Sequence, residues 1–222
     1  MYQRFFKRLI DIVCALMGIL GTSPLWLLAI IGIEVSDPGP VFYVAKRIGR
    51  KNRPFGMFKF RSMTVDRNAN EKSLRPDQNR IFWWGQVMRR LKIDELPQLL
   101  NILNGTMSVI GPRPASADQV EVVRAGKYAV VSDVACGLSG PSALYDYVYG
   151  DRFENEQEYV QKVLPTRLEL DYYYVHHVSF GYDCKMVWQT IVCIVYALLG
   201  KEANHILREL ESDAASINIY KN

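Results

Sequence analysis

The sequence is poor in the side chains that hold metals or form disulfides. It has four cysteines and three histidines among 222 residues, and no two cysteines stand in a CxxC pair. This spacing excludes a zinc ribbon and gives no disulfide framework, and it fits a domain that faces a reducing cytoplasm.

The sequence also has little excess charge of either sign, since the net charge is only +4. That surplus suits anionic lipid or a phosphorylated substrate better than nucleic acid.

Long hydrophobic runs are equally scarce, with one exception near the N-terminus. Residues 9–33 contain a single charged side chain, that of Asp11. As a helix this run would reach roughly 37 Å, which is enough to cross a bilayer. It is too long for a signal peptide and lacks a clean cleavage site. We therefore predict a membrane anchor, in which Asp11 needs a partner such as Lys7 or Arg8 one turn earlier.

The pair Ser23-Pro24 lies in the middle of this apolar run. Proline removes an N–H donor and clashes with the preceding turn, so we expect the helix to break there. Basic residues flank the run on both sides and favour a cytoplasmic location for both of its ends: Arg4, Lys7, Arg8, Lys46, Arg47, Arg50, Lys51 and Arg53. A re-entrant helix that breaks and returns satisfies this pattern. A simple spanning anchor with a tolerated proline is the alternative.

The rest of the chain predicts an α/β protein of the α+β type that is mostly helical. After a turn at 36–40, strands at 41–44 and 55–63 form a β-hairpin that carries Lys59 and Arg61. Helical patterns then cover 81–103, 115–129 and 167–210. The apolar stretch 186–199 predicts an amphipathic helix at the membrane interface, with a buried core helix as the alternative.

The stretch 89–98 is the most informative for chemistry. Pro97 suits the first turn of a helix, and this places Asp94 and Glu95 near a helix N-terminus, where free N–H groups favour anions. Three cations stand just upstream, at 89, 90 and 92, and suit a diphosphate. Two adjacent carboxylates can act as a nucleophile and as ligands of Mg2+. The alternative is that Asp94 is only a helix cap beside a solvated basic face.

Gly111-Pro112-Arg113-Pro114 follows this helical region. Two prolines around one arginine stiffen the turn and fix the direction of the guanidinium, which suits bidentate phosphate recognition. The alternative is a structural turn with an exposed arginine. A glycine-containing loop follows at 136–140, and glycine alone says little about its role.

Several of these pieces occur in a set order along almost the whole chain. They are Lys7–Asp11, Ser23-Pro24, Phe58–Met63, Asp94–Leu99 with Asn101, Met107–Pro114 and Asp171–Tyr174. In this order and spacing the sequence resembles the bacterial sugar transferase family, the monotopic phosphoglycosyl transferases. The ordered set is specific, although no single motif is decisive.

The resemblance implies a reaction and a location. Members attach to the cytoplasmic face of the bacterial inner membrane through a re-entrant helix broken at the Ser-Pro pair. They transfer a sugar 1-phosphate from a UDP-sugar to polyprenyl phosphate. By this resemblance Asp94 is the nucleophile, forming a covalent phosphosugar intermediate with release of UMP, and Glu95 assists. Asp94 and Glu95 would also hold Mg2+.

The resemblance also implies binding residues and a domain plan. The candidate phosphate contacts are Lys59, Arg61, Arg89 and Arg113, and the lipid phosphate would arrive near Lys7 and Arg8. The expected plan is a re-entrant membrane anchor at 1–35, a cytoplasmic catalytic domain at 36–210 and a tail at 211–222. The expected partners are a UDP-sugar, polyprenyl phosphate and membrane lipids, without nucleic acid. A homo-oligomer is left open.

The glycine loop departs from the family pattern. Where members carry Arg-Pro-Gly and then a tryptophan, this chain has Ala135–Gly137 and Pro141–Leu144. The change bears on nucleotide or sugar contacts and leaves Asp94 and Glu95 intact. We therefore expect an enzyme that starts the assembly of a glycoconjugate. A non-catalytic membrane-bound partner of a glycan-assembly pathway is the alternative.

Overall fold

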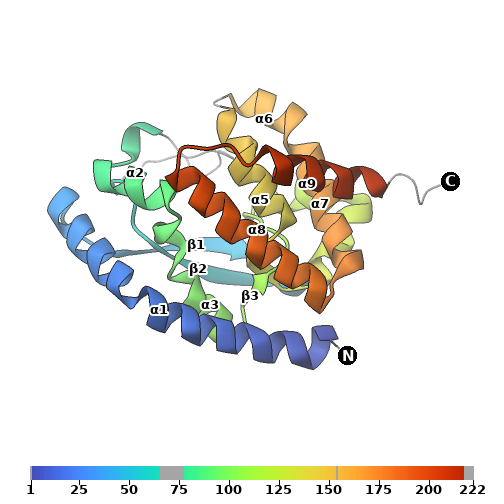
Figure 1. Ribbon diagram of the computed structural model, residues 1–222, viewed down its shortest axis with the longest axis horizontal. Coiled ribbons are helices and arrows are strands. Elements are labelled where there is room, and N and C mark those ends of the chain that lie inside the picture. Colours follow the sequence, from blue (N-terminus) through green and yellow to red (C-terminus); the bar gives the residue numbers. More distant parts are fainter. Residues whose placement is uncertain (1, 66–77, 154, 218–222) are drawn as a thin grey trace.

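The computed structural model describes residues 2–65, 78–153 and 155–217 and is mostly helical (Figure 1). A π-helical turn, Tyr2–Phe6, leads into the long helix α1, Lys7–Ser36. α1 lies along one side of the molecule, and the other helices lie to one side of it with two small two-stranded sheets. This arrangement confirms the predicted, mostly helical class with a small β component.

Helix α1 is continuous through Pro24, so the break expected at Ser23-Pro24 is not confirmed. The Thr22 hydroxyl donates to the Gly18 carbonyl at 2.6 Å, and the Ser23 hydroxyl donates to the Leu20 carbonyl at 2.8 Å. Such bonds let a helix bend without ending, and Figure 1 shows that α1 is curved. Among the residues that the structure describes, α1 is the one helix long and apolar enough to cross a membrane.

The first turns of α1 are tied to the rest of the chain by polar side chains. Asp11 is buried, and its Oδ1 accepts from the Ser108 hydroxyl at 3.0 Å and from the Val109 N–H at 2.9 Å. These groups, and not a basic residue one turn earlier, are its hydrogen-bond partners. The Lys7 ammonium instead pairs with Asp183 at 2.6 Å. Both contacts satisfy charges that would be costly to leave unpaired in an apolar setting.

The stretch 81–103, predicted to be helical throughout, is divided. It contains α2, Trp83–Arg90, a 3-10 turn, Ile93–Glu95, and α3, Gln98–Leu103. Lys92 has a φ of 57°, a left-handed conformation that is uncommon for a residue with a Cβ and that stops α2. Pro97 directly precedes α3, as its place at a helix start predicted. Asp94 and Glu95 therefore lie in the short turn between two helices.

Strands β1, Phe42–Ile48, and β2, Pro54–Phe60, form the predicted antiparallel hairpin around a 3-10 turn at 50–52. The first strand is longer than expected, and the second ends earlier. Asn101 of α3 fixes this hairpin, because its fully buried side chain accepts from the Phe58 N–H at 2.8 Å and donates to the Gly56 carbonyl at 2.7 Å. Strand β2 is thereby fixed at Phe58, the residue before Lys59.

A second sheet pairs two segments that are distant in the sequence. β3, Met107–Ile110, runs parallel to β4, Cys136–Ser139, so the expected glycine loop is largely a strand. A Cβ on Gly137 would lie 2.1 Å from the backbone nitrogen of Gly111, so this close approach requires glycine. The helix predicted at 115–129 is reduced to α4, Val120–Val123, and a following 3-10 segment, Gly126–Asp133.

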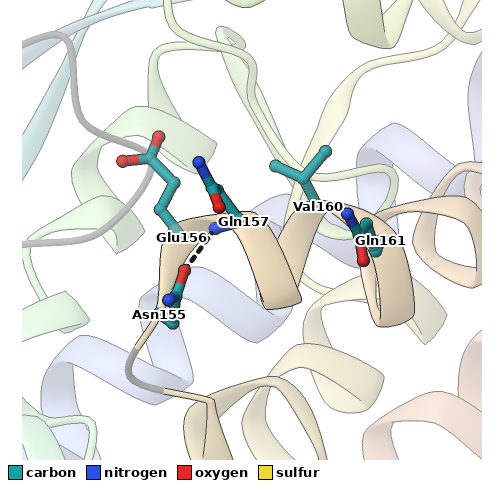
Figure 2. A pocket seen from close by; sticks show the side chains of 5 residues that line it. All are labelled: Asn155, Glu156, Gln157, Val160 and Gln161. Carbon is teal, nitrogen blue, oxygen red and sulfur yellow. Dashed lines mark hydrogen bonds between the residues drawn. The ribbon is translucent and has the colours of Figure 1, made fainter.

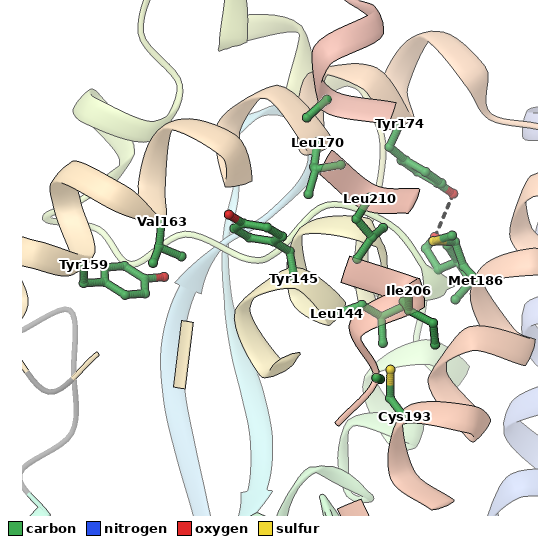
Figure 3. Close-up of a cluster of buried hydrophobic side chains, with 13 residues drawn as sticks. Leu144, Tyr145, Tyr159, Val163, Leu170, Tyr174, Met186, Cys193, Ile206 and Leu210 are labelled. Atoms are coloured by element: carbon green, nitrogen blue, oxygen red, sulfur yellow. Dashed lines mark hydrogen bonds between the residues drawn. The ribbon is translucent and has the colours of Figure 1, made fainter. Parts of the chain in front are cut away.

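The C-terminal part is a helical bundle with the largest hydrophobic core. Its elements are α5, Pro141–Val148, a 3-10 turn, Gly150–Arg152, α6, Glu156–Lys162, α7, Leu164–His177, α8, Phe180–Leu198, and α9, Asn204–Ser216. Figure 3 shows Leu170, Tyr174 and Leu210 at its centre, all fully buried. The expected tail boundary at 210 falls inside α9, and α9 packs on this core.

A buried carboxyl group joins this bundle to the turn around Arg113. Asp171 of α7 is 6% exposed, and its Oδ1 accepts from the Ser142 hydroxyl and, at 3.4 Å, from the backbone N–H of Arg113. Burial raises the pKa of Asp171 to about 6, and the hydrogen bond from Ser142 offsets this only in part.

We predict that Asp171→Asn, which keeps the oxygen acceptor and removes the charge, changes the pH dependence of stability. The carboxyl has a pKa near 3.8 when unfolded and about 6 when folded, so wild-type stability falls as pH rises between these values. The shift is equivalent to about 3 kcal/mol. The Tm of the variant minus that of wild type, measured in detergent, should therefore rise from about pH 4 to about pH 7. An equal pH dependence in both proteins contradicts this, and exposed Glu158→Gln on α6 is the control.

Candidate functional site

A cavity of about 610 Å³ lies where the hairpin, the α2–α3 turn, α5 and the α8–α9 turn meet. Of its eighteen lining residues seven are basic and four are acidic. The charged ones are Lys59, Arg89, Arg90, Lys92, Asp94, Glu95, Arg113, Asp146, Arg152, Lys201 and Glu202. This volume is typical of ligand sites, and the positive excess suits a polyanionic ligand.

Asp94 is the most unusual acidic group in the cavity. It is 4% exposed, and its Oδ1 has no hydrogen-bond partner among the residues that the structure describes. Burial raises the pKa of Asp94, and the nearby Lys59 ammonium opposes this rise without cancelling it. A buried carboxyl oxygen without a partner is costly, and such groups mark sites where a ligand or a reaction supplies the missing interaction.

Glu95, the next residue, is in the opposite state. Its Oε1 accepts from the Lys59 ammonium of β2 at 2.9 Å. Burial by itself would raise the pKa of Glu95, but the Lys59 and Lys92 ammonium groups outweigh it and hold this pKa well below the usual range. The two neighbouring carboxyls therefore differ, because Glu95 is ionised and held by Lys59 while Asp94 keeps an uncommitted oxygen.

Arg113 reaches the cavity from the loop after β3, as its proline-flanked turn predicted. Its guanidinium lies 3.3 Å from Asp146, a residue of α5 that the sequence analysis did not identify. Asp146 also accepts from the Tyr159 hydroxyl at 2.7 Å and lies 3.9 Å from Arg167. Burial would raise the pKa of Asp146, but the two guanidinium groups outweigh it and lower this pKa. Asp146 therefore acts as an ionised anchor for Arg113.

Some expected site residues lie elsewhere. Arg61 is 5% exposed; it pairs with Asp37 and donates to the Pro40 carbonyl at 2.6 Å, so it joins the end of α1 to β2 and does not line the cavity. Lys7 is paired with Asp183, and Arg8 donates to the carbonyls of α3 at its C-terminal end. Ser23 and Pro24 belong to α1 and do not line the cavity either.

The acidic pair fits a magnesium ion, although the described residues contain no cluster of three or more metal-ligating side chains. Mg2+ is usually held by one or two carboxylates together with substrate phosphates and water, so a larger cluster is not required. Asp94 would supply an oxygen that has no hydrogen-bond partner within residues 2–65, 78–153 and 155–217, and Glu95 would supply an ionised carboxylate beside it. The cations around them would hold the phosphates that complete such a site.

A second hollow, of about 940 Å³, lies along α6 (Figure 2). All of its lining residues come from one short stretch, 155–161, and Asn155 among them caps the helix by accepting from the Gln157 N–H at 2.8 Å. Figure 2 shows these side chains side by side on the helix rather than converging on a point. We therefore assign the site to the first cavity.

The matches to known proteins agree with this geometry. The family model described as "Bacterial sugar transferase" matches residues 2–197. The chain is 34% identical over 194 residues to a UDP-N-acetylgalactosamine-undecaprenyl-phosphate N-acetylgalactosaminephosphotransferase of Aeromonas hydrophila, covering 86% of this chain and 44% of that protein. It is 33% identical over 203 residues to an uncharacterized sugar transferase of Bacillus subtilis (strain 168), covering 91% and 94% of the two chains.

A further relative is a UDP-glucose:undecaprenyl-phosphate glucose-1-phosphate transferase of Xanthomonas campestris pv. campestris. It is 33% identical over 193 residues, covering 85% of this chain and 38% of the relative. The chain thus spans less than half the length of the Aeromonas and Xanthomonas proteins and nearly all of the Bacillus protein. The family match covers most of the chain and three relatives exceed 30% identity, and on this evidence the chain belongs to the bacterial sugar transferase family.

Proposed function

We propose that this protein transfers a sugar 1-phosphate from a UDP-sugar to polyprenyl phosphate, with Asp94 as the nucleophile. The observation that carries this proposal is the buried Asp94 Oδ1, which has no hydrogen-bond partner in the described part of the chain and lies in a cavity with a positive excess. The names of the Aeromonas and Xanthomonas relatives give UDP-sugars and undecaprenyl phosphate as their substrates, and this supports the same chemistry here. The product would be the first lipid-linked sugar of a glycoconjugate.

In the first step, the Asp94 carboxylate attacks the phosphorus that carries the sugar. A bond forms between Asp94 and this phosphorus, and the bond to the oxygen that bridges the two phosphates breaks. UMP leaves with that electron pair. In the second step, an oxygen of polyprenyl phosphate attacks the same phosphorus, and the bond to Asp94 breaks. The carboxylate is regenerated, and the product is a polyprenyl diphosphosugar.

The cationic residues of the cavity bind and orient the diphosphate. Lys59, Arg89 and Arg113 line the cavity together with Asp94. Their fixed positive charges stabilise the negative charge that moves onto the leaving UMP, and they act strongly because the site is partly closed to water. Lys59 also keeps Glu95 ionised and holds it in place beside Asp94. Mg2+ held by Asp94 and Glu95 would neutralise further phosphate charge when bound.

The lipid substrate requires a site beside a membrane, and two helices supply an apolar surface. α8 buries Met186 and Cys193 on one face. On the other face it exposes Phe180, Trp188, Ile191, Val195 and Leu198. The first turn of α8 lies beside the π-helical turn that precedes α1, where the rings of Phe180 and Tyr2 are 6.2 Å apart. We therefore propose that α8 lies at the membrane interface. In this proposal α1, which is continuous but curved, enters the cytoplasmic leaflet of the inner membrane with both of its ends on the cytoplasmic side.

We predict that Asp94→Asn lowers the rate of UMP release from UDP-sugars by on the order of a thousandfold or more. The assay is run in detergent with polyprenyl phosphate and Mg2+. The amide cannot form the covalent intermediate. Wild type given donor alone should gain the mass of one phosphosugar, and the variant should gain none. Asp118→Asn, at an exposed position outside the cavity, is the control. Turnover by Asp94→Asn refutes the nucleophile, and an inactive wild type favours a non-catalytic partner.

A second prediction concerns the metal. Chelation with EDTA should stop UMP release by the wild type, and added Mg2+ should restore it. Glu95→Gln removes one ionised ligand, so this variant should need more Mg2+ than wild type to reach half of its own maximal rate. A Mg2+ requirement that is unchanged in Glu95→Gln shows that Glu95 does not hold the ion.

A third prediction concerns the membrane topology. Tags at residues 1 and 222 should both be accessible in inverted inner-membrane vesicles and protected in intact spheroplasts. Both basic flanks of α1 would then lie on the cytoplasmic side. Pro24→Leu restores the missing N–H donor and should move part of the N-termini to the opposite side. An N-terminal tag that is exposed in wild-type spheroplasts rules out the re-entrant anchor.

A further inference from the structure

Part of the wall of the cavity that holds Asp94 and Glu95 comes from a segment outside the family match. That match ends at residue 197, yet the turn at 200–203, between α8 and α9, lines the same cavity. The residues of this turn that face the cavity include Lys201 and Glu202, whose side chains are exposed. The site of this chain therefore contains charged groups that lie beyond the segment shared with the family.

This turn is held in a defined position. Gly200 has a φ of 65° and ends α8, with its N–H donating to the Ala197 carbonyl at 3.3 Å. The N–H of Lys201 donates to the Tyr196 carbonyl at 2.8 Å, and the two bonds together form a Schellman-type helix end. On the other side, α9 buries Ile206 and Leu210 in the core. The turn is thus fixed at both ends.

Two arginines from other elements contact the turn and the end of α8 that precedes it. Arg152, at the end of the 3-10 turn after α5, lies 3.4 Å from Glu202 and 3.4 Å from the Asn204 side-chain oxygen. Arg90 of α2 donates to the Ala197 carbonyl at 3.3 Å. The Arg152–Glu202 pair is half exposed, so it is weakly bound and can exchange partners at little cost.

These groups suit a sugar ring better than a nucleotide base. A carboxylate, an ammonium and a guanidinium can donate to and accept from the hydroxyls of a sugar. The turn offers no aromatic side chain on which a base would stack, and stacking is the usual way in which proteins hold a base. The names of the Aeromonas and Xanthomonas relatives share UDP and undecaprenyl phosphate but differ in the sugar, so selection among sugars is needed within the family.

From this geometry we infer that the turn at 200–203, with Arg152, contacts the sugar of the UDP-sugar and selects among donors. The inference rests on the proposed function. The phosphorus under attack lies at Asp94, the cations beside it take the diphosphate, and the sugar extends toward Lys201 and Glu202.

The test compares Lys201→Ala/Glu202→Ala with wild type. The matched control is Glu158→Ala/Lys162→Ala, an exposed pair on α6 that lies outside this cavity. UMP release is measured with UDP-glucose, UDP-galactose, UDP-N-acetylglucosamine and UDP-N-acetylgalactosamine, and inhibition is measured with UDP. We expect the ratio of kcat/KM between the best donor and its epimer to fall by about tenfold in the cavity variant, with inhibition by UDP unchanged.

Two results overturn the inference. Equal losses for every donor and for UDP would assign the turn to the nucleotide, and unchanged donor ratios would leave it without a role in selection. A wild type that releases no UMP from any donor refutes the proposed function instead. Calorimetric titration of both proteins with UDP and with each UDP-sugar then still tests the inference. In wild type the affinity for a UDP-sugar should exceed the affinity for UDP, and in the cavity variant this difference should be lost. The same difference in both proteins contradicts the inference.

Discussion

The ion pair between Lys59 and Glu95 gives two neighbouring carboxyl groups different properties. Without Lys59, the buried Asp94 and the partly buried Glu95 beside it would repel each other, and both would tend to take up a proton. With it, Glu95 is ionised and held in place, whereas Asp94 keeps one oxygen that no described residue binds. The pair depends on the register of β2, and Asn101 fixes that register by binding the backbone on both sides of Met57. One buried amide thus supports the arrangement of the acids.

A second buried acid extends this arrangement toward the membrane. Asp11 of α1 binds the Ser108 hydroxyl and the Val109 N–H of β3, and β3 leads directly to the turn that carries Arg113. The apolar helix is therefore not a loose tether, because it is bonded to a strand that ends beside the cavity. Lys7 and Asp183 add a contact to α8. A lipid substrate lying along α1 or α8 would reach a site whose distance from these helices is fixed by the same bonds.

The sequence predicted those features that depend on local signals. Pro97 marked the start of α3, alternating residues marked the hairpin, and prolines around Arg113 marked a rigid turn. The left-handed Lys92, which divides the predicted helical stretch, has no comparable signal, since its conformation is set by the packing around it. Asp146 was missed because it lies 33 positions from Arg113 in the sequence and meets it only in the folded chain. The parallel pairing of those strands links residues almost thirty positions apart, and periodicity does not reveal it.

The acidic residues on the cavity wall explain how so many cations can be kept together without a ligand. Guanidinium and ammonium groups at close range repel one another, and without counter-charges they would turn toward solvent. Asp146 anchors Arg113 from the α5 side. Glu202 supplies a weaker, half-exposed counter-charge to Arg152 from the α8–α9 turn. Because basic residues still outnumber acidic ones, the cavity keeps a positive excess for a diphosphate. The structure thus keeps these basic groups oriented in advance, which would lower the ordering cost of binding a diphosphate.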